Sequence, residues 1–210
     1  MTADVVWVVR HARRRDFDDP RWATGARRLH DPPLSETGRA QARELARSLA
    51  LHDVSHLVSS PFLRCVETAA PLSERLSLPI ALEPGLSEWM NRAWFPEPPE
   101  LHPLEELVRR FPRIDAAWTP RGCACHGESG EEALERSGRV ARMLAEELSG
   151  AVVLVGHGAS TLGATCALLR VHSAAAPELD YGWTLALRRL PLGWVLDRGP
   201  LPPGFAGAPS

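Results

Sequence analysis

Lysine is absent from this 210-residue chain, whose 24 Lys and Arg residues are all arginines. The absence excludes a P-loop lysine, a lysine Schiff base with pyridoxal phosphate, and a lysine general base. It does not exclude phosphate chemistry, because guanidinium groups bind phosphate oxygens in a bidentate manner. A phosphate site in this chain would therefore rest on arginine.

Long hydrophobic runs and an excess of one charge sign are also missing. The longest apolar runs, such as Ala151–Val155, have the length of a strand and cannot span a bilayer. The formal net charge of -2 gives no electrostatic basis for binding nucleic acid or a membrane surface. The apolar segment Val5–Val9 is followed at once by Arg10, unlike the basic-then-apolar order of a signal peptide. We therefore expect a cytoplasmic protein that binds neither nucleic acid nor membrane.

Cysteine is scarce, with four residues at Cys65, Cys123, Cys125 and Cys166. In a cytoplasmic chain we expect free thiols rather than disulfides. The spacing of Cys123, Cys125 and His126 invites a zinc interpretation, but structural zinc sites space their cysteines two to four residues apart and need a second pair of ligands. We therefore expect no metal site, and the sequence leaves the role of these three residues open.

The length and composition are those of one soluble globular domain, which we place at residues 1–198. Apolar periodicity and Gly/Pro punctuation predict the secondary structure. Strands are predicted at residues 4–9, 54–58, 79–82, 151–155, 181–190 and 193–196, and helices at 36–51, 62–76, 104–111, 131–148 and 159–169. We expect Pro71 to bend or break its helix, and the Pro/Gly-rich tail 199–210 to be disordered.

Two segments interrupt the alternation of strands and helices. Residues 16–33 are polar and aperiodic, which predicts a long loop, and residues 91–128 combine many prolines with Trp94, Phe95 and Trp118. The second segment predicts an inserted lid or subdomain, since it carries aromatic residues to pack. The whole pattern predicts an α/β fold: a three-layer α/β/α sandwich with a mainly parallel central sheet and this inserted lid. In such sheets ligands bind beyond the carboxyl ends of the strands.

Two predicted strands run into a histidine at their carboxyl ends. Val5–Val9 is followed by Arg10 and His11, and Val152–Val155 is followed, after one glycine, by His157. If both strands are central and parallel, both imidazoles emerge at one edge of the sheet. A single histidine after a strand is more often a packing or surface residue, but two at equivalent strand ends indicate a site.

A third strand end contributes an arginine. Arg64 follows Ser59–Leu63 and lies in the first turn of a predicted helix, where backbone N–H groups favour an anion. With Arg10 and Arg14 beside His11, it gives three guanidinium groups able to surround a dianionic phosphoryl group. The pattern therefore predicts a phosphate site.

Phosphoryl transfer through histidine needs a neutral imidazole nucleophile, cations, a second stabilising group and an acid for the leaving oxygen. His11, the arginines and His157 fit the first three. Glu88 beside Trp89 fits the acid, because partial burial against an apolar wall would raise the pKa of its carboxyl. An exposed helical glutamate explains Glu88 equally well, and Glu128 is a second carboxylate that also fits a helix start. The sequence leaves the choice between the two open.

Four motifs in order carry a resemblance to a known family. They are Arg10-His11-Ala12 after a strand, Leu34–Gly38 opening a helix, Ser59–Arg64, and Gly156-His157-Gly158. Together they resemble the histidine phosphatase (phosphoglycerate-mutase-like) superfamily over roughly residues 5–170. Within it, three segments are most similar to the phosphatase domain of the ubiquitin-associated, SH3-containing phosphatases and to steroid-phosphate phosphatases. These segments are Asp31–Ser35, Ser60–Cys65 and Glu83–Trp89.

The resemblance implies roles for the residues that match the family's motifs. His11 would be the phosphorylated nucleophile, His157 the second histidine of the phosphate pocket, and Glu88 the proton donor. The phosphate ligands would be Arg10, Arg14 and Arg64. Neither a metal ion nor another cofactor is implied.

Several departures bear on the reaction. Ala12 stands where glycine is usual after the nucleophile, and the Thr-x-x-Asn stretch that often follows the nucleophile in the mutase-like enzymes is absent. The Tyr-Gly stretch that carries the donor glutamate in true phosphoglycerate mutases is also absent. Gly158 rather than aspartate follows His157, which points away from the acid-phosphatase and phytase branch.

We therefore expect a cofactor-independent phosphomonoesterase that forms a phosphohistidine at His11 and acts on a small-molecule or peptidyl phosphate ester. Two alternatives stay open: a phosphomutase of the same superfamily, and a non-catalytic protein that binds a phosphorylated ligand. The complete set of site residues argues against the second alternative. The sequence determines neither the physiological substrate nor the oligomeric state, and it leaves a homodimer open.

Overall fold

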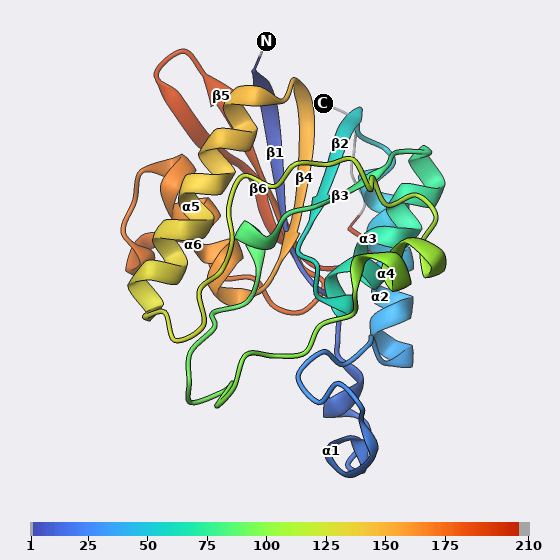
Figure 1. Ribbon diagram of the computed structural model, residues 1–210. Helices are drawn as coiled ribbons and strands as arrows, with labels where there is room; N and C mark the ends of the chain where they lie inside the picture. The colour runs from blue at the N-terminus through green and yellow to red at the C-terminus, as the bar shows by residue number, and fades with distance from the viewer. Residues whose placement is uncertain (1, 206–210) are drawn as a thin grey trace.

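The computed structural model describes residues 2–205 and arranges them around a six-stranded sheet (Figure 1). The strand order is β3-β2-β4-β1-β5-β6; the first four are parallel, and β5 and β6 are antiparallel. The strands are β1 (Ala3–Arg10), β2 (Val54–Ser59), β3 (Ile80–Leu82), β4 (Gly150–Gly156), β5 (Thr184–Leu190) and β6 (Gly193–Leu201). The α-helices are α1 (Trp22–Gly25), α2 (Glu36–Leu49), α3 (Leu63–Leu76), α4 (Leu104–Arg110), α5 (Gly130–Glu147) and α6 (Gly158–Leu169).

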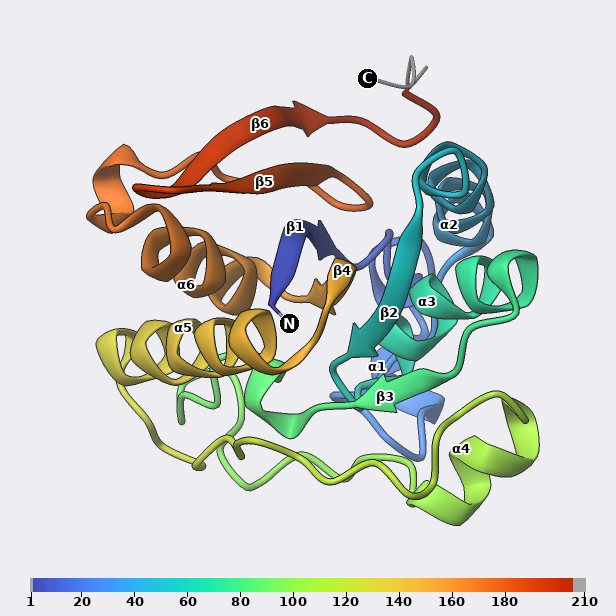
Figure 2. The same ribbon diagram turned by 90° about the horizontal axis from the view of Figure 1, so that it is seen from above.

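Helices cover both faces of the sheet, which confirms the predicted three layers. Figure 2 shows α2 and α3 on one side of the strands and α5 and α6 on the other. The central strand β1 is buried on both faces, because Val6 and Val8 belong to one apolar cluster while Trp7 and Val9 belong to the other. Alternate residues of a strand point to opposite faces, so a continuous apolar run is the sequence of a strand covered on both sides.

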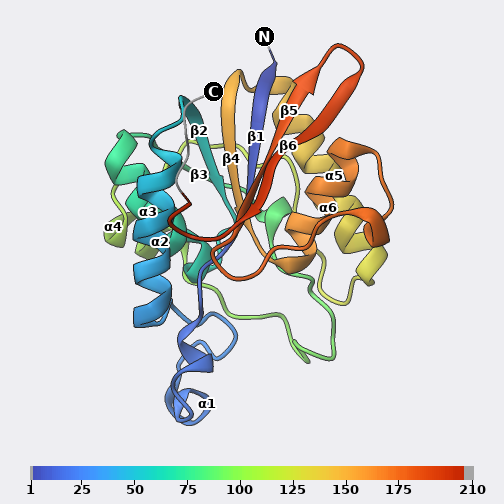
Figure 3. The same ribbon diagram turned by 180° about the vertical axis from the view of Figure 1, so that it is seen from behind.

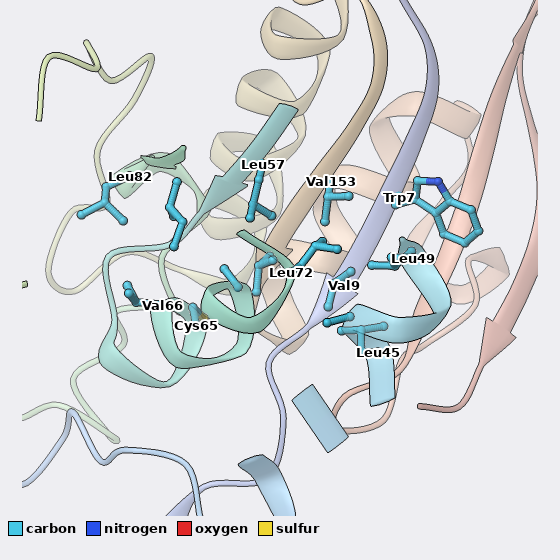
Figure 4. Close-up of a cluster of buried hydrophobic side chains, with 14 of the residues drawn as sticks. Trp7, Val9, Leu45, Leu49, Leu57, Cys65, Val66, Leu72, Leu82 and Val153 are labelled. Carbon is cyan, nitrogen blue, oxygen red and sulfur yellow. The ribbon is translucent and has the colours of Figure 1, made fainter. Parts of the chain in front are cut away.

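The cluster on the α2–α3 face anchors the helix that carries Arg64. Figure 4 shows Leu45 of α2 and Leu72 of α3 packed with Val9 and Val153 of the sheet. Fully burying a leucine side chain contributes about 1.5–3 kcal/mol, so this packing holds α3 firmly against the carboxyl ends of the strands.

Two glycines set the close approach of α5 and α6 on the opposite face. A Cβ at Gly163 would lie 2.2 Å from Oγ of Ser137, and one at Gly138 would lie 2.9 Å from the carbonyl oxygen of Gly163. A side chain at either position would force the helices apart. This contact fixes α6, which begins directly after His157.

The structure differs from the predicted elements in two details. Pro71 does not break its helix, since α3 runs continuously from Leu63 to Leu76. A proline removes only one backbone donor, and residues on either side of it, Ala69 and Leu72, are buried in the core. The predicted long loop at residues 16–33 contains the short helix α1 and a 3-10 turn, Arg15–Phe17 (η1).

The tail is also more ordered than predicted. Residues 199–201, expected to be disordered, form the end of β6, where Leu201 pairs with Thr184 of β5. The ring of Phe205 stacks on Trp7 with centroids 5.8 Å apart. The ordered chain thus extends past residue 198, because β6 continues its pairing with β5 and Phe205 packs on the apolar surface of Trp7. Residues 206–210 lie outside the described part of the chain.

The inserted segment 91–128 runs along the outer side of β3 and carries α4, as seen in Figures 1 and 2. Ile114 forms a parallel bridge with Ile80, so the segment adds backbone pairing at the β3 edge of the sheet. Its first part places Trp94 and Phe95 in the wall of a cavity described below. Among residues 2–205, no helix combines the length and apolarity needed to cross a membrane.

Candidate active site

The two strand-end histidines meet at the carboxyl edge of the sheet. β1 and β4 are parallel neighbours with Arg10 opposite Gly156, and the backbone N–H of His11 donates to the Gly156 carbonyl at 2.9 Å. The imidazole rings of His11 and His157 lie with centroids 5.2 Å apart, and both are buried. The expectation that the strands bring both rings to one edge is confirmed; the view from behind in Figure 3 shows β1 and β4 side by side.

The tautomer of His11 is determined by its own backbone. Nδ1 donates to the carbonyl oxygen of Ala12 at 2.8 Å, which leaves Nε2 with the lone pair. Burial lowers the pKa of His11 well below 6.5, and the positive charge of Arg64 acts in the same direction. His11 is therefore neutral near pH 7, the state that a nitrogen nucleophile requires.

His157 is held by three neighbouring side chains. Its Nδ1 accepts from Nη2 of Arg64 at 3.2 Å, and its Nε2 lies 2.9 Å from Oγ of Ser60. Phe62 packs edge-on against the ring with centroids 5.0 Å apart. Burial, followed by the charge of Arg64, lowers the pKa of His157 to about 4 against an opposing effect of Glu88. The ring is neutral and fixed in orientation.

Arg64 lies at the base of the site and is 1% exposed. Besides its bond to His157, Nη2 lies 3.6 Å from Oε2 of Glu88, and Nη1 donates to the carbonyl of His30 at 3.3 Å and lies 3.9 Å from Oδ1 of Asp31. Its Nε is buried and has no hydrogen-bond partner among the described residues. A buried guanidinium with an unused N–H group is suited to an anionic ligand.

Glu88 joins this group, but in the opposite protonation state from the one predicted. Burial alone would raise the pKa of its carboxyl, yet His157 and then Arg64 outweigh burial and hold that pKa well below its usual range. The expected apolar wall is not where the sequence suggested, because the indole of Trp89 donates to the carbonyl of Glu128 and packs against Trp94. In the free protein Glu88 is a carboxylate.

The other two predicted arginines lie on the wall of a cavity that Glu88 also lines. Nη1 of Arg10 donates to the carbonyl of Leu179 at 2.8 Å, and the guanidinium carbon lies 4.0 Å from the ring centroid of Tyr181. The Nε atom of Arg10 is buried and has no hydrogen-bond partner in the described structure. Arg14 forms a bidentate ion pair with Asp16. Arg10 thus has an unused donor, whereas Arg14 is already engaged.

Glu128, the second candidate proton donor, is paired elsewhere. Both of its oxygens accept from Arg136, at 2.9 and 2.5 Å, and Oε1 also accepts from the backbone of Met90 at 3.2 Å. Arg136 further donates to the carbonyl oxygens of Gly85 and Ser87. This buried pair joins α5 to the loop after β3, so the geometry favours Glu88 over Glu128 as the carboxyl of the site.

Sequence reasoning gave no role to three residues that complete the site. Ser60 forms the hydrogen bond to His157 described above. Asp31 accepts from the backbone N–H of Leu63 at 2.8 Å and so caps the helix that carries Arg64. The ring of Tyr181 lies with its centroid 5.4 Å from that of His11. Ser60 and Asp31 lie in motifs that carried the family resemblance, which was the available signal. Tyr181 follows a loop far along the chain and had none.

The cavity beside these residues has a volume of about 670 Å³. Its walls come from four parts of the chain: residues between 10 and 30, the segment 88–95, the start of α6 at Gly158, and Tyr181. Part of the inserted segment 91–128 therefore borders the cavity, and its role as a lid stays a prediction.

Three side chains of the site could also hold a metal ion by their spacing alone. The nearest ligand atoms of His11, Glu88 and His157 lie within 4.8 Å of one another. However, Arg64 donates to His157 and lies beside Glu88, so a fixed positive charge occupies the same space. The arrangement fits an anion better than a divalent cation.

The Cys123–His126 segment lies apart from this group. Cys123 and Cys125 are exposed free thiols, and Nε2 of His126 donates to the carbonyl of Phe95 at 2.8 Å. His126 thus connects two parts of the inserted segment. Cys65 is a buried thiol 3.4 Å from Nε2 of His157, and burial raises its pKa strongly, so it is unreactive packing behind the imidazole.

Known proteins are similar to this chain in sequence and in fold. A model of the histidine phosphatase superfamily (branch 1) matches residues 6–191. The transcription factor tau 55 kDa subunit of Saccharomyces cerevisiae is 30% identical over 188 residues, covering 80% of this chain and 42% of that protein. The ecdysteroid-phosphate phosphatase of Drosophila melanogaster is 34% identical over 149 residues, covering 65% of this chain and 19% of that protein. The human ubiquitin-associated and SH3 domain-containing protein A is 32% identical over 154 residues, covering 67% of this chain and 23% of that protein.

A solved structure extends the similarity to the whole fold. The ecdysone phosphate phosphatase from Bombix mori, crystallised with tungstate, superposes with a TM-score of 0.77 over 99% of this chain and 96% of that chain, at 22% identity. The chain spans less than half the length of the three curated relatives named above. The resemblance inferred from the motifs is confirmed by these matches.

Proposed function

The chain belongs to the histidine phosphatase superfamily, and we propose that it is a metal-independent phosphomonoesterase that works through a phosphohistidine at His11. One observation carries the proposal: a neutral His11 with a free Nε2 lies buried beside His157, Arg64 and Glu88. Such a site offers a nucleophile, a cation and a carboxyl group within reach of one phosphorus atom.

In the first step, Nε2 of His11 attacks phosphorus, and the bond between phosphorus and the ester oxygen breaks. The unused Nε–H groups of Arg64 and Arg10 point to donors for the phosphoryl oxygens. His157 stabilises the transition state from the carboxyl end of the neighbouring strand β4, and Arg14 contributes positive charge from the cavity wall.

Glu88 supplies the proton to the leaving oxygen once the substrate is bound. In the free protein His157 and Arg64 keep this carboxyl ionised. A bound phosphate dianion offsets the positive charge of Arg64 and adds negative charge beside the carboxylate, which raises the proton affinity of Glu88. In the second step the Glu88 carboxylate takes a proton from water, the resulting hydroxide attacks phosphorus, and the bond from phosphorus to Nε2 breaks.

The substrate is a phosphate ester small enough for its organic group to enter the 670 Å³ cavity: a small molecule or a phosphorylated side chain. Two of the relatives are named for steroid-phosphate hydrolysis. One is named as a transcription factor subunit, so binding without turnover must be distinguished from catalysis by experiment.

Trapping the intermediate tests the mechanism. Wild-type protein quenched during turnover of a ³²P-labelled ester should carry acid-labile, base-stable label, and His11→Ala should carry none and lose nearly all activity. His172→Ala, which changes an exposed histidine outside the site, is the matched control and should label like wild type. Label on serine or cysteine, or label retained in His11→Ala, would overturn the proposal.

Vanadate distinguishes an enzyme from a phosphate-binding protein. It adopts a pentacoordinate geometry like that of the transition state, so a catalytic pocket should bind it more tightly than phosphate. Equal dissociation constants for the two anions would favour the binding function. Release of inorganic phosphate, rather than an isomeric ester, separates hydrolysis from a phosphomutase reaction.

A further inference from the structure

A carboxylate engages Arg14 in the wall of the cavity. The turn η1 brings Asp16 back beside Arg14, whose Nε donates to Oδ1 at 2.9 Å while Nη2 pairs with Oδ2. The two side chains are 25% and 19% exposed, whereas the neighbouring Arg13–Asp18 pair is 40% and 35% exposed. A shielded bidentate pair is stronger and better fixed than a surface pair, so Asp16 is a permanent part of this wall.

The charged side chains on the cavity wall leave no free guanidinium group to bind a second anionic group of the substrate. Among the described residues that line it, the arginines are Arg10 and Arg14, and together with Arg64 beneath them they serve the phosphoryl group. Asp16 and Asp19 line the same cavity. A carboxylate or second phosphate on the substrate would therefore meet negative charge and no unused guanidinium.

Apart from Glu88 and His30, the rest of the wall is mainly apolar. Aromatic and aliphatic side chains face the cavity from three parts of the chain: Phe17, Trp22, Leu29, Trp94, Phe95 and Tyr181. Phe17 and Trp94 are 45% and 54% exposed in the free protein, so they offer surface that an uncharged organic group would cover. The wall thus accepts an apolar group at the place where Asp16 repels an anion.

We propose that Asp16 is a specificity-determining residue: by pairing with Arg14 beside the phosphate site, it restricts the enzyme to monoesters whose organic group carries no second anionic group. The inference rests on the proposed phosphatase function and adds the charge class of its substrate. We expect uncharged aryl or polycyclic phosphates to be accepted as substrates, and phosphorylated carboxylic acids and bisphosphates to be disfavoured.

Two matched esters test the role of Asp16. 4-Carbamoylphenyl phosphate and 4-carboxyphenyl phosphate have similar size and similar leaving groups and differ by one negative charge. Wild type should prefer the amide by about tenfold or more in kcat/KM, the effect expected of one partly shielded like charge a few ångströms away. Asp16→Asn should reduce the ratio of the two kcat/KM values to about threefold or less, chiefly through KM. Asp18→Asn, which removes a carboxylate outside the cavity lining, should keep the wild-type ratio.

The ratio cancels the effect of freeing Arg14 on the phosphate that both esters share, whereas any attraction of the freed Arg14 for the carboxylate belongs to the proposed role of Asp16. An unchanged ratio in Asp16→Asn, or an equal loss of preference in Asp18→Asn, would overturn the inference. If wild type hydrolyses neither ester, the proposed phosphatase function fails instead. Dissociation constants of the two esters for wild type and Asp16→Asn, measured by calorimetry, then still show whether Asp16 discriminates against the carboxylate.

Discussion

Oε2 of Glu88 lies 3.4 Å from Nδ1 of His157, although the two residues belong to loops after different strands. The same oxygen is 3.6 Å from Nη2 of Arg64. The Glu88 carboxylate thus supplies the negative charge beside Arg64 in the free protein. When a substrate binds, its phosphate dianion takes over this pairing with Arg64. This relationship explains why a group proposed as an acid is ionised before the substrate arrives.

The effect of replacing Glu88 should depend on the leaving group. Glu88→Gln should slow hydrolysis of an alkyl phosphate by roughly 10²–10⁴-fold, the usual contribution of a general acid. The same change should cost much less on p-nitrophenyl phosphate, because its phenolate leaves without a proton. It should also flatten the alkaline limb of the pH–rate profile for the alkyl ester. Steady-state kinetics on both esters measures this, and equal losses would show that Glu88 only positions the pocket.

Replacing Glu128 should affect stability instead. Glu128→Gln leaves the buried guanidinium of Arg136 without its charged partner, which should lower the free energy of unfolding by about 3–5 kcal/mol. Urea unfolding of this variant, with exposed Glu131→Gln as the control, measures the difference. The ratio of its rates on alkyl and aryl esters should stay at the wild-type value. A leaving-group dependence like that of Glu88→Gln would assign the acid to Glu128 after all.

Stability should fall as pH drops from 6.5 towards about 4. Burial, followed by Arg64, lowers the pKa of His157 to about 4, so in this range the unfolded chain binds a proton that the folded chain does not. His11, whose pKa burial also lowers, adds to the same slope. The carboxylate of Glu88 loses its stabilising charge only at lower pH, because its pKa is lowered from an ordinary value of 4.5.

Urea unfolding of wild type and His157→Gln at several values between pH 7 and pH 5 separates these contributions. The variant should show the shallower decline, since glutamine does not titrate. Parallel declines in the two proteins would contradict a neutral, buried His157.

Chelators should leave the activity unchanged. The spacing of His11, Glu88 and His157 would allow a metal ion, but Arg64 places positive charge among them. Activity measured after dialysis against EDTA should equal that of untreated protein. Loss of activity in EDTA, with recovery on adding a divalent cation, would show that a metal takes part in the reaction.

The order of apolar runs along the chain was enough to predict the architecture and the edge of the sheet at which the site lies. Continuous apolar runs such as Val5–Val9 and Val152–Val155 predict a sheet that is covered on both faces. The residues that follow parallel strands lie at the same edge of the sheet. The position of His11 beside His157 follows from that rule. The break that the sequence allowed at Pro71 does not occur, because burial of the surrounding helix in the core outweighs local backbone chemistry.

The charge state of each site residue was decided only by the tertiary structure. The ionised state of Glu88, the pairing of Glu128 with Arg136 and the engagement of Arg14 by Asp16 depend on which charges come within a few ångströms of one another. Sequence gives the identity of a titratable group, whereas its pKa follows from burial and from neighbours that the fold brings together. Folding alone placed Glu88 against His157 and Arg64, and this placement distinguishes it from Glu128.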